Sequence, residues 1–220
     1  MNIRECENLK EIRFSEKDVA LMRRLNISSC MNLRSLYIHR APNFEDINIT
    51  ECSDLEDFDS QRVPLIKIVD LSSLPLLDYI WCLWCPNFET IKMAESGYRD
   101  LHQFAIIDTA IRSVDLSKCP KIDGAVAIDC PNLELFDLSG CSALRKFWTY
   151  VTGEYESGYP KAEIRLPLQH SSGVLFGLRE YAFGKDEASW CKKVFVANER
   201  IKQKVIKTGY PENRIEIYQP

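Results

Sequence analysis

An 11-residue repeat constrains the fold of this chain more than any other feature of its sequence. In residues 30–38 and 130–138, a leucine that follows an asparagine is itself followed by apolar residues three and five positions later. We call this leucine, or the residue in its place, the anchor. The anchors are Leu9, Met22, Leu33, Phe44, Leu55, Ile66, Leu77, Phe88, Leu101, Ile111, Ile122, Leu133 and Leu144. Successive anchors are 11 residues apart, except for steps of 13 after Leu9, 13 after Phe88 and 10 after Leu101.

This period predicts short strands. An 11-residue repeat also suits a right-handed helical coil, but prolines would interrupt such a helix two residues before many anchors. These prolines are Pro42, Pro64, Pro75, Pro86, Pro120 and Pro131. Apolar residues at +3 and +5 fit a turn followed by a strand that places both side chains on one face. Two units, about 22 residues, match the length of one solenoid coil. Residues 1–150 are therefore predicted to form about six coils, or 13 half-repeats, each coil with two parallel strands on opposite sides of a flattened tube.

The Cys-x-x-Leu-x-x-Leu-x-Leu units and their Cys-Pro-Asn turns resemble the leucine-rich repeat family, in its cysteine-containing bacterial versions. The resemblance implies a mainly β solenoid with a right-handed coil. Residues 178–183 and 191–196, with a short helix after them, are similar to the closing repeat of BspA-like leucine-rich proteins. That similarity implies a cell-surface protein.

Residues 151–220 are predicted to cap the solenoid with a small α+β unit, because an end coil would otherwise expose its core. We expect strands at 163–166, 173–176, 194–196 and 214–218. Residues 199–207 read as an amphipathic helix, with Asn198 capping its start and Gly209 ending it.

Seven of the nine cysteines lie three residues before an anchor, where other units have Val, Ala or Leu. They are Cys6, Cys30, Cys52, Cys85, Cys119, Cys130 and Cys141. A repeat position that holds Cys in some units and an apolar residue in others predicts buried thiols. The alternatives are a disulfide ladder between successive coils, or a redox or zinc site at the single C-x-x-C pair, Cys82 and Cys85. We predict no metal and no cofactor.

The outward positions +2, +4 and +6 differ between the two sides of the tube. On the side begun by Met22, positions +4 and +6 are mostly short polar residues, which favours turns. On the side begun by Leu9, large side chains point outward, and this side is the predicted recognition surface. Its candidate ligand-binding residues are Tyr37, His39, Asp57, Asp59, Tyr79, Trp81, Trp148 and Tyr150. One alternative is that Asp57 and Asp59 form an ordinary solvated strand face. Another is that the C-terminal segment or a second copy of the chain covers the aliphatic residues Leu83, Ile107, Val126 and Ile128.

Composition narrows the function classes. Hydrophobic residues make up 45% of the 220-residue chain, which excludes a disordered chain, and the formal net charge of −4 provides no basic surface for nucleic acid. No apolar run approaches the roughly 18 residues of a membrane span. The expected compartment is the cytoplasm, or the cell surface or exterior if the chain is a trimmed piece.

No catalytic motif is present, so we expect a non-enzymatic module that binds a protein or a glycan. One alternative is a structural spacer that self-associates into a homo-oligomer. Another is a thiol-dependent enzyme that pairs His170 with Cys191.

Overall fold

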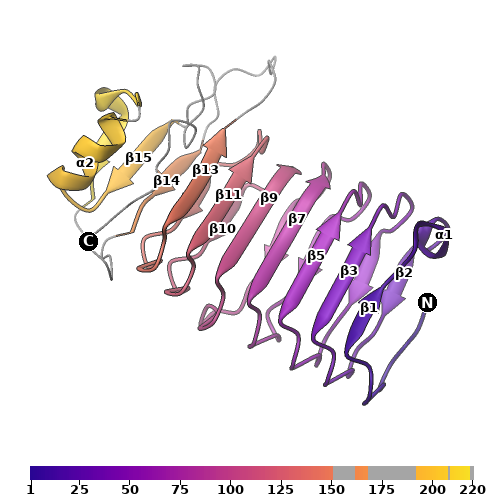
Figure 1. Ribbon diagram of the computed structural model, residues 1–220. Helices are drawn as coiled ribbons and strands as arrows, with labels where there is room; N and C mark the ends of the chain where they lie inside the picture. Colours follow the sequence, from indigo (N-terminus) through magenta and orange to yellow (C-terminus); the bar gives the residue numbers. More distant parts are fainter. Residues whose placement is uncertain (151–161, 168–191, 208, 219–220) are drawn as a thin grey trace.

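The computed structural model describes residues 1–150, 162–167, 192–207 and 209–218. Over these residues the chain is mostly β, and its parallel strands stack as a β-solenoid of about eight turns with a spacing of about 22 residues (Figure 1). The predicted fold class is confirmed. Residues 1–150 contain 13 strands, one for each predicted anchor.

One side of the tube is a continuous parallel sheet of seven strands. In spatial order these are β1 (Glu11–Arg13), β3 (Ser35–His39), β5 (Asp57–Gln61), β7 (Tyr79–Cys85), β9 (Gln103–Thr109), β11 (Gly124–Ile128) and β13 (Lys146–Tyr150). Equivalent repeat positions are Cα partners, so that Tyr37, Asp59 and Trp81 lie side by side on β3, β5 and β7. This is the side on which the sequence predicts the recognition surface.

The opposite side consists of shorter strands in three separate sheets within the described residues. The sheets are β2 (Arg24–Asn26) with β4 (Asp46–Asn48); β6 (Ile68–Asp70) with β8 (Thr90–Lys92); and β10 (Ser113–Asp115), β12 (Leu135–Asp137), β14 (Glu163–Arg165), β15 (Lys193–Val196) and β16 (Ile215–Ile217). Here the outward polar residues form turns, as predicted. Asn26 Oδ1, for example, accepts a hydrogen bond of 3.1 Å from the Ser28 backbone N–H, and Asp115 Oδ1 accepts one of 2.9 Å from that of Ser117.

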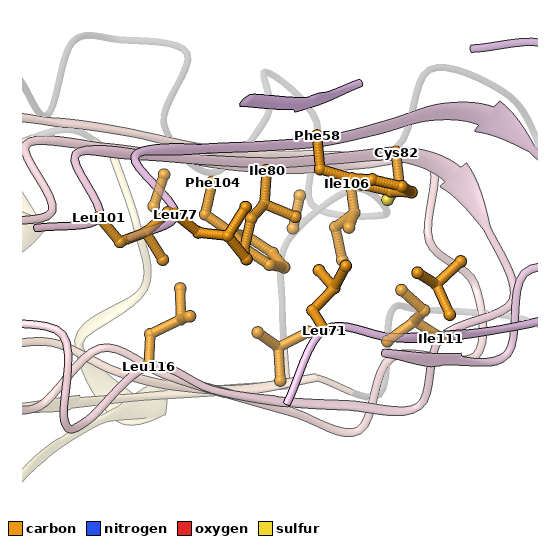
Figure 2. Close-up of a cluster of buried hydrophobic side chains, with 14 of the residues drawn as sticks. Phe58, Leu71, Leu77, Ile80, Cys82, Leu101, Phe104, Ile106, Ile111 and Leu116 are labelled. Carbon is orange, nitrogen blue, oxygen red and sulfur yellow. The ribbon is translucent and has the colours of Figure 1, made fainter. Parts of the chain in front are cut away.

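The core lies between the two sides. Figure 2 shows Ile80 and Phe104 from the seven-stranded sheet pointing into the tube, with Leu71 and Leu116 on the opposite side. Most anchors and most residues at +3 and +5 are shielded from solvent, and Leu33, Leu36 and Ile38 are 0% exposed. The exceptions are partly buried and pack against the core: Leu9, Phe14, Ile91 and Met93. Burial of these side chains is the main stabilising term, at roughly 25 cal/mol per Å² of apolar surface.

The C-terminal elements agree with the prediction where they are described. Strand β14 corresponds to the expected strand at 163–166, β15 to 194–196 and β16 to 214–218. Helix α2 (Glu199–Ile206) starts where predicted, and the side chain of Asn198 accepts a hydrogen bond from the Ile201 N–H. Gly209 has a φ of 91° and donates its N–H to Ile206 O, which suits its predicted place at the end of the helix. The strand expected at 173–176 lies outside the described residues.

The eight described cysteines are free thiols, and all except the partly buried Cys6 are buried; Cys191 lies outside the described residues. Five of their sulfur atoms, those of Cys30, Cys52, Cys85, Cys130 and Cys141, donate hydrogen bonds to carbonyl groups one coil earlier. Cys30 Sγ lies 3.2 Å from Ile3 O, Cys52 Sγ 3.1 Å from Ile27 O and Cys141 Sγ 3.3 Å from Leu116 O. The prediction of buried thiols is confirmed, and neither the disulfide ladder nor a disulfide between Cys82 and Cys85 is formed.

The register can be tested with two neighbouring residues. Leu133 is 3% exposed, whereas the side chain of Glu134 is exposed. Leu133→Asp would bury an unpaired charge in the stack and should lower the free energy of unfolding by more than about 4 kcal/mol. Glu134→Ala should change it by less than about 0.5 kcal/mol. Thermal and urea melts of both variants measure the difference, and similar behaviour of the two would contradict the register.

The buried thiols predict a loss of stability in alkali. Burial raises the pKa of Cys52 and of Cys130 to about 11. A thiol in an unfolded chain titrates near 8.5, so above about pH 8.5 the unfolded chain releases protons that the folded protein keeps. The free energy of unfolding should therefore fall between about pH 8.5 and 11, by up to about 1.4 kcal/mol per pH unit for each thiol.

Urea unfolding from neutral pH to about pH 10.5 measures this slope. The double variant Cys52→Ala, Cys130→Ala should lose stability less steeply over the same range, because it lacks two of the groups that titrate on unfolding. Equal slopes in the two proteins would show that these thiols are not the source.

Candidate functional site

Five of the eight predicted site residues line one hollow on the outer face of the seven-stranded sheet. The hollow has a volume of about 170 Å³ and is lined by Tyr37, Asp57, Phe58, Asp59, Tyr79 and Trp81. It spans β3, β5 and β7, which lie next to one another in Figure 1. The two described helices, α1 (Glu16–Val19) and α2, lie toward the two ends of the solenoid and leave these strands uncovered (Figure 1).

Strand geometry explains why these residues meet. Side chains alternate along a strand, and equivalent positions on paired strands lie about 4.8 Å apart. Tyr37, Asp59 and Trp81 therefore form one row across the sheet, and Asp57 and Tyr79 belong to the parallel row two residues earlier. The arrangement places two carboxylates among three aromatic rings.

Asp59 is the most buried polar group of the site. Only 9% of its surface is exposed, and its Oδ1 atom is buried without a hydrogen-bond partner. Its Oδ2 atom accepts a hydrogen bond of 3.0 Å from Gln61 Nε2. The Nε2 atom of His39 also lies 3.0 Å from Asp59 Oδ2, but it is not in line for a hydrogen bond and has no other partner. The site thus contains an acceptor with unused capacity, which is costly in a buried position.

Asp57 is better satisfied. Its Oδ2 atom accepts a hydrogen bond of 2.8 Å from Ser35 Oγ and a longer contact of 3.5 Å from the Tyr37 hydroxyl. On the side of Tyr37 toward the N-terminal end of the sheet, the guanidinium carbon of Arg13 lies 4.0 Å from the centre of the ring. Arg13 is itself paired with Glu11, at 2.9 Å.

Several carboxylates lie near Tyr79 at the hollow. The pKa of the Tyr79 hydroxyl is raised above its ordinary value, first by the carboxylate of Asp78, then by partial burial and by Asp57 and Asp123. Each of these charges disfavours a further negative charge at Tyr79 and favours a positive one nearby.

The other predicted residues are placed differently. His39 lies beside Asp59 at the edge of the hollow. Trp148 occupies the same row as Trp81 but on β13, beyond Ala105 and Val126, so it does not contribute to the hollow. Tyr150 is the last residue of β13, and its side chain lies outside the part of the structure that is described.

The aliphatic part of the face is less open than its outward register suggests. Leu83 is 8% exposed, and Ile107, Val126 and Ile128 are half-buried. The alternative that the C-terminal segment covers them involves residues 151–161 and 168–191, which are not among the described residues. The proposed pairing of His170 with Cys191 also falls in this range.

Sequence reasoning did not single out three residues that shape the site. Ser35 and Gln61 hold the two carboxylates, and Arg13 stacks on Tyr37. All three occupy outward positions on strands that carry candidate residues or lie beside them. Their repeat positions, next to the candidate residues, were the only sequence signal that could have identified them. Their hydrogen bonds could not be predicted, because these depend on side-chain rotamers.

A second hollow of about 200 Å³ lies on the opposite side, next to β8 and β10. These strands are not hydrogen-bonded to each other, and the 13-residue step after Phe88 falls between them. In this step Gly97 adopts a φ of 71°, and the next residue, Tyr98, is fully buried with its hydroxyl donating to Leu71 O at 2.8 Å. We attribute this hollow to the break in strand pairing between β8 and β10.

Comparison with known proteins does not place the chain in a family. No protein-family model matches it, and no curated protein matches it. Neither described helix is long and apolar enough to cross a membrane. Among the described residues, no group of three or more His, Cys, Asp or Glu side chains is arranged to hold a metal ion.

Two aspartates at the same repeat position provide a test of the site. Asp59 and Asp70 both occupy +4, on opposite sides of the tube. Asp70 Oδ1 accepts hydrogen bonds from the Ser72 N–H and hydroxyl, and these bonds together with Lys92 keep its pKa below the ordinary value. Asp70→Val should therefore lower the free energy of unfolding by about 1–2 kcal/mol.

Asp59→Val should instead raise the free energy of unfolding by about 1 kcal/mol, because it removes a buried, partly unpaired charge from a strand and introduces a β-branched residue. Urea unfolding at neutral pH compares the two variants. If Asp59→Val destabilises as much as Asp70→Val, Asp59 serves the fold rather than a ligand.

Proposed function

We propose that the protein is a non-enzymatic recognition module that binds a protein or a glycan through the outer face of its seven-stranded sheet. The observation that carries this proposal is the hollow between Tyr37, Tyr79 and Trp81, with the carboxylates of Asp57 and Asp59 among the rings. A solenoid of this kind is compatible with a binding or a structural repeat module.

The contrast between the two sides of the tube supports the proposal. On the opposite side the outward Asn and Asp residues are used by the turns that close each coil. On the seven-stranded side no such local role accounts for the large rings at Tyr37, Tyr79 and Trp81. Aromatic side chains on rigid strands are favourable binding anchors because they contribute much contact area and lose little conformational entropy.

The sheet also provides preorganisation. Strand β5 is paired over its full length with β3 on one side and β7 on the other. The backbone below the hollow is therefore fixed before a ligand arrives, which reduces the entropic cost of binding.

The chemistry of the C-x-x-C thiols and of two histidines supports a non-enzymatic role. Burial raises the pKa of Cys82 and Cys85, which disfavours the thiolate that nucleophilic catalysis needs. His39 and His102 each lie beside a carboxylate, Asp59 and Asp78, rather than beside a nucleophile.

Self-association is a second candidate, and one observation favours it. Leu83, Ile107 and Ile128 are register partners on three adjacent strands, β7, β9 and β11, and Val126 lies beside them. A continuous aliphatic strip of this kind suits a contact between copies of the chain. Sedimentation over a range of concentrations tests it, because Ile128→Lys should abolish any dimer that uses this strip.

The main proposal is tested by removing the aromatic anchors. Trp81→Ala with Trp148→Ala should weaken binding by at least about tenfold, because aromatic anchors dominate binding free energy. Ligands would be obtained by selecting peptide and glycan libraries against the unmodified protein, and binding would be measured by calorimetry.

The matched control is Trp84→Ala. Trp84 is 41% exposed but lies at the corner after the face, with a φ of 56°. This variant should bind as tightly as the unmodified protein. If the double variant stays folded and retains full affinity for every selected ligand, the outer face is not the recognition surface.

A further inference from the structure

The hollow on β3, β5 and β7 has the chemistry of a site for one particular class of cation. Its lining combines four aromatic residues, three of them at outward positions, with two carboxylates, and Asp59 within it is nine-tenths buried with an unpartnered oxygen. A ligand that satisfies such a group must bring hydrogen-bond donors, and the surrounding negative charge favours donors that carry positive charge.

We propose that this hollow binds the guanidinium group of an arginine side chain presented by a partner protein, with Asp59 and Asp57 accepting its N–H groups and Tyr37 and Trp81 flanking its plane. The inference rests on the proposed function and specifies its ligand. The hollow is then a pocket for a single side chain of the partner, within the larger recognition face.

The spacing of the residues in the row Tyr37, Asp59, Trp81 suits a planar guanidinium group. Its two aromatic residues are separated by two strand spacings, about 9.6 Å. That spacing between strands is wide enough for one planar group to stack on either ring. The carboxylate of Asp59 stands between the rings, where such a group would meet it edge-on.

Asp59 also has enough free hydrogen-bond acceptor positions for a guanidinium group. A carboxylate has about four acceptor positions, and Asp59 uses one of them for a well-formed hydrogen bond, from Gln61. Rotation about its Cβ–Cγ bond exchanges the two oxygens, so either can turn toward the hollow. A guanidinium presents five N–H donors in a planar fork that matches a carboxylate.

The protein itself contains one half of the proposed contact. Arg13 and Tyr37 are partners on β1 and β3, and the guanidinium of Arg13 stacks on that ring at 4.0 Å. Along the row the order is therefore cation, aromatic, anion, aromatic: Arg13, Tyr37, Asp59, Trp81. A second guanidinium over Asp59 would extend this alternation, with Tyr37 placed between two cations and Trp81 closing the hollow.

Two competing ligand classes fit less well. A quaternary ammonium would interact with the rings, but it has no N–H group for the unpartnered oxygen of Asp59. A neutral sugar has hydroxyl donors and stacks on aromatic rings, but it gains little from the negative potential that Asp57, Asp78 and Asp123 create around Tyr79. The combination of planar stacking, donors and positive charge selects guanidinium.

The test is an NMR titration of the ¹⁵N-labelled protein with N-acetyl-arginine methylamide and, in parallel, with its citrulline counterpart. The two probes have the same shape, but citrulline is uncharged. We expect the arginine probe to cause saturable shifts in β3, β5 and β7 and at the Trp81 indole N–H, with a dissociation constant in the millimolar range, equivalent to about −4 kcal/mol. The citrulline probe should bind at least about tenfold more weakly, since it lacks the charge.

Variants separate this inference from general binding to the face. Asp59→Asn keeps the shape of the side chain and should weaken the arginine probe at least about tenfold. Asp115→Asn, on the opposite side of the tube, is the control and should leave its binding unchanged. Equal binding of arginine and citrulline, undiminished binding to Asp59→Asn, or no saturable shift by the arginine probe at its solubility limit would overturn the inference.

A third probe distinguishes failure of the inference from failure of the proposed function. If N,N′-diacetylchitobiose saturates the same signals while the arginine probe does not, the hollow is a glycan site. In that case the recognition face stands and the arginine assignment is wrong. If ligands selected from libraries depend on neither Trp81 nor Trp148, the proposed function itself fails.

Discussion

The parallel hydrogen-bonded ladder of the seven-stranded sheet is the constraint on which both the core and the candidate site depend. Strands about 22 residues apart pair at equivalent repeat positions. Each position of the repeat therefore becomes a row that runs along the solenoid, with alternate rows directed inward and outward. A slip of one residue would exchange the apolar rows with the outward rows and expose the core. The register that buries Leu36 and Ile38 is thus the same register that places Tyr37 beside Asp59.

The sharp turn at the end of a strand explains why cysteine suits the position that follows it. Non-glycine residues adopt positive φ at successive corners, an arrangement that costs roughly 1–2 kcal/mol each and persists only where the surroundings enforce it. In most cases this residue directly precedes the cysteine position, as Ser29 precedes Cys30 and Glu51 precedes Cys52. The sharp turn directs the next side chain into the tube close to a backbone carbonyl of the preceding coil. A thiol is small and apolar enough for this place and can donate to that carbonyl. Cysteine is therefore a packing residue here, which is why Ala and Val replace it in other coils.

The sequence predicts this architecture well because the repeat is a local pattern that recurs 13 times, and each recurrence supports the same register. It also places Asp57, Asp59, Tyr79 and Trp81 on one face, since alternation along a strand requires it. Interactions that the repeat does not encode were not predictable. The hydrogen bond from Ser35 to Asp57 depends on rotamers, and the burial of Tyr98 depends on how the 13-residue step after Phe88, two residues longer than the period, folds back into the core. After residue 150 the period ends, and only elements with their own local signals, such as the Asn198 cap, could be recognised.

Aspartates at the +4 position on the opposite side of the tube show how the fold usually satisfies a carboxylate there. Asp70 and Asp115 accept hydrogen bonds from the serine two residues later, and Asp137 accepts one from Ser139 and pairs with Arg165 at 2.8 Å. Asp59 occupies the same position on the other side, is buried, and retains an unpartnered oxygen. Because the chain satisfies these other aspartates with its own groups, the exception at Asp59 is unfavourable for folding and leaves one hydrogen-bond donor missing. An incoming donor group would supply it. A ligand without donors would leave the carboxylate both desolvated and unpaired, so the same unfavourable group would discriminate against it. Selectivity at this face would then arise from what Asp59 lacks in the free protein rather than from the area of the aromatic rings around it.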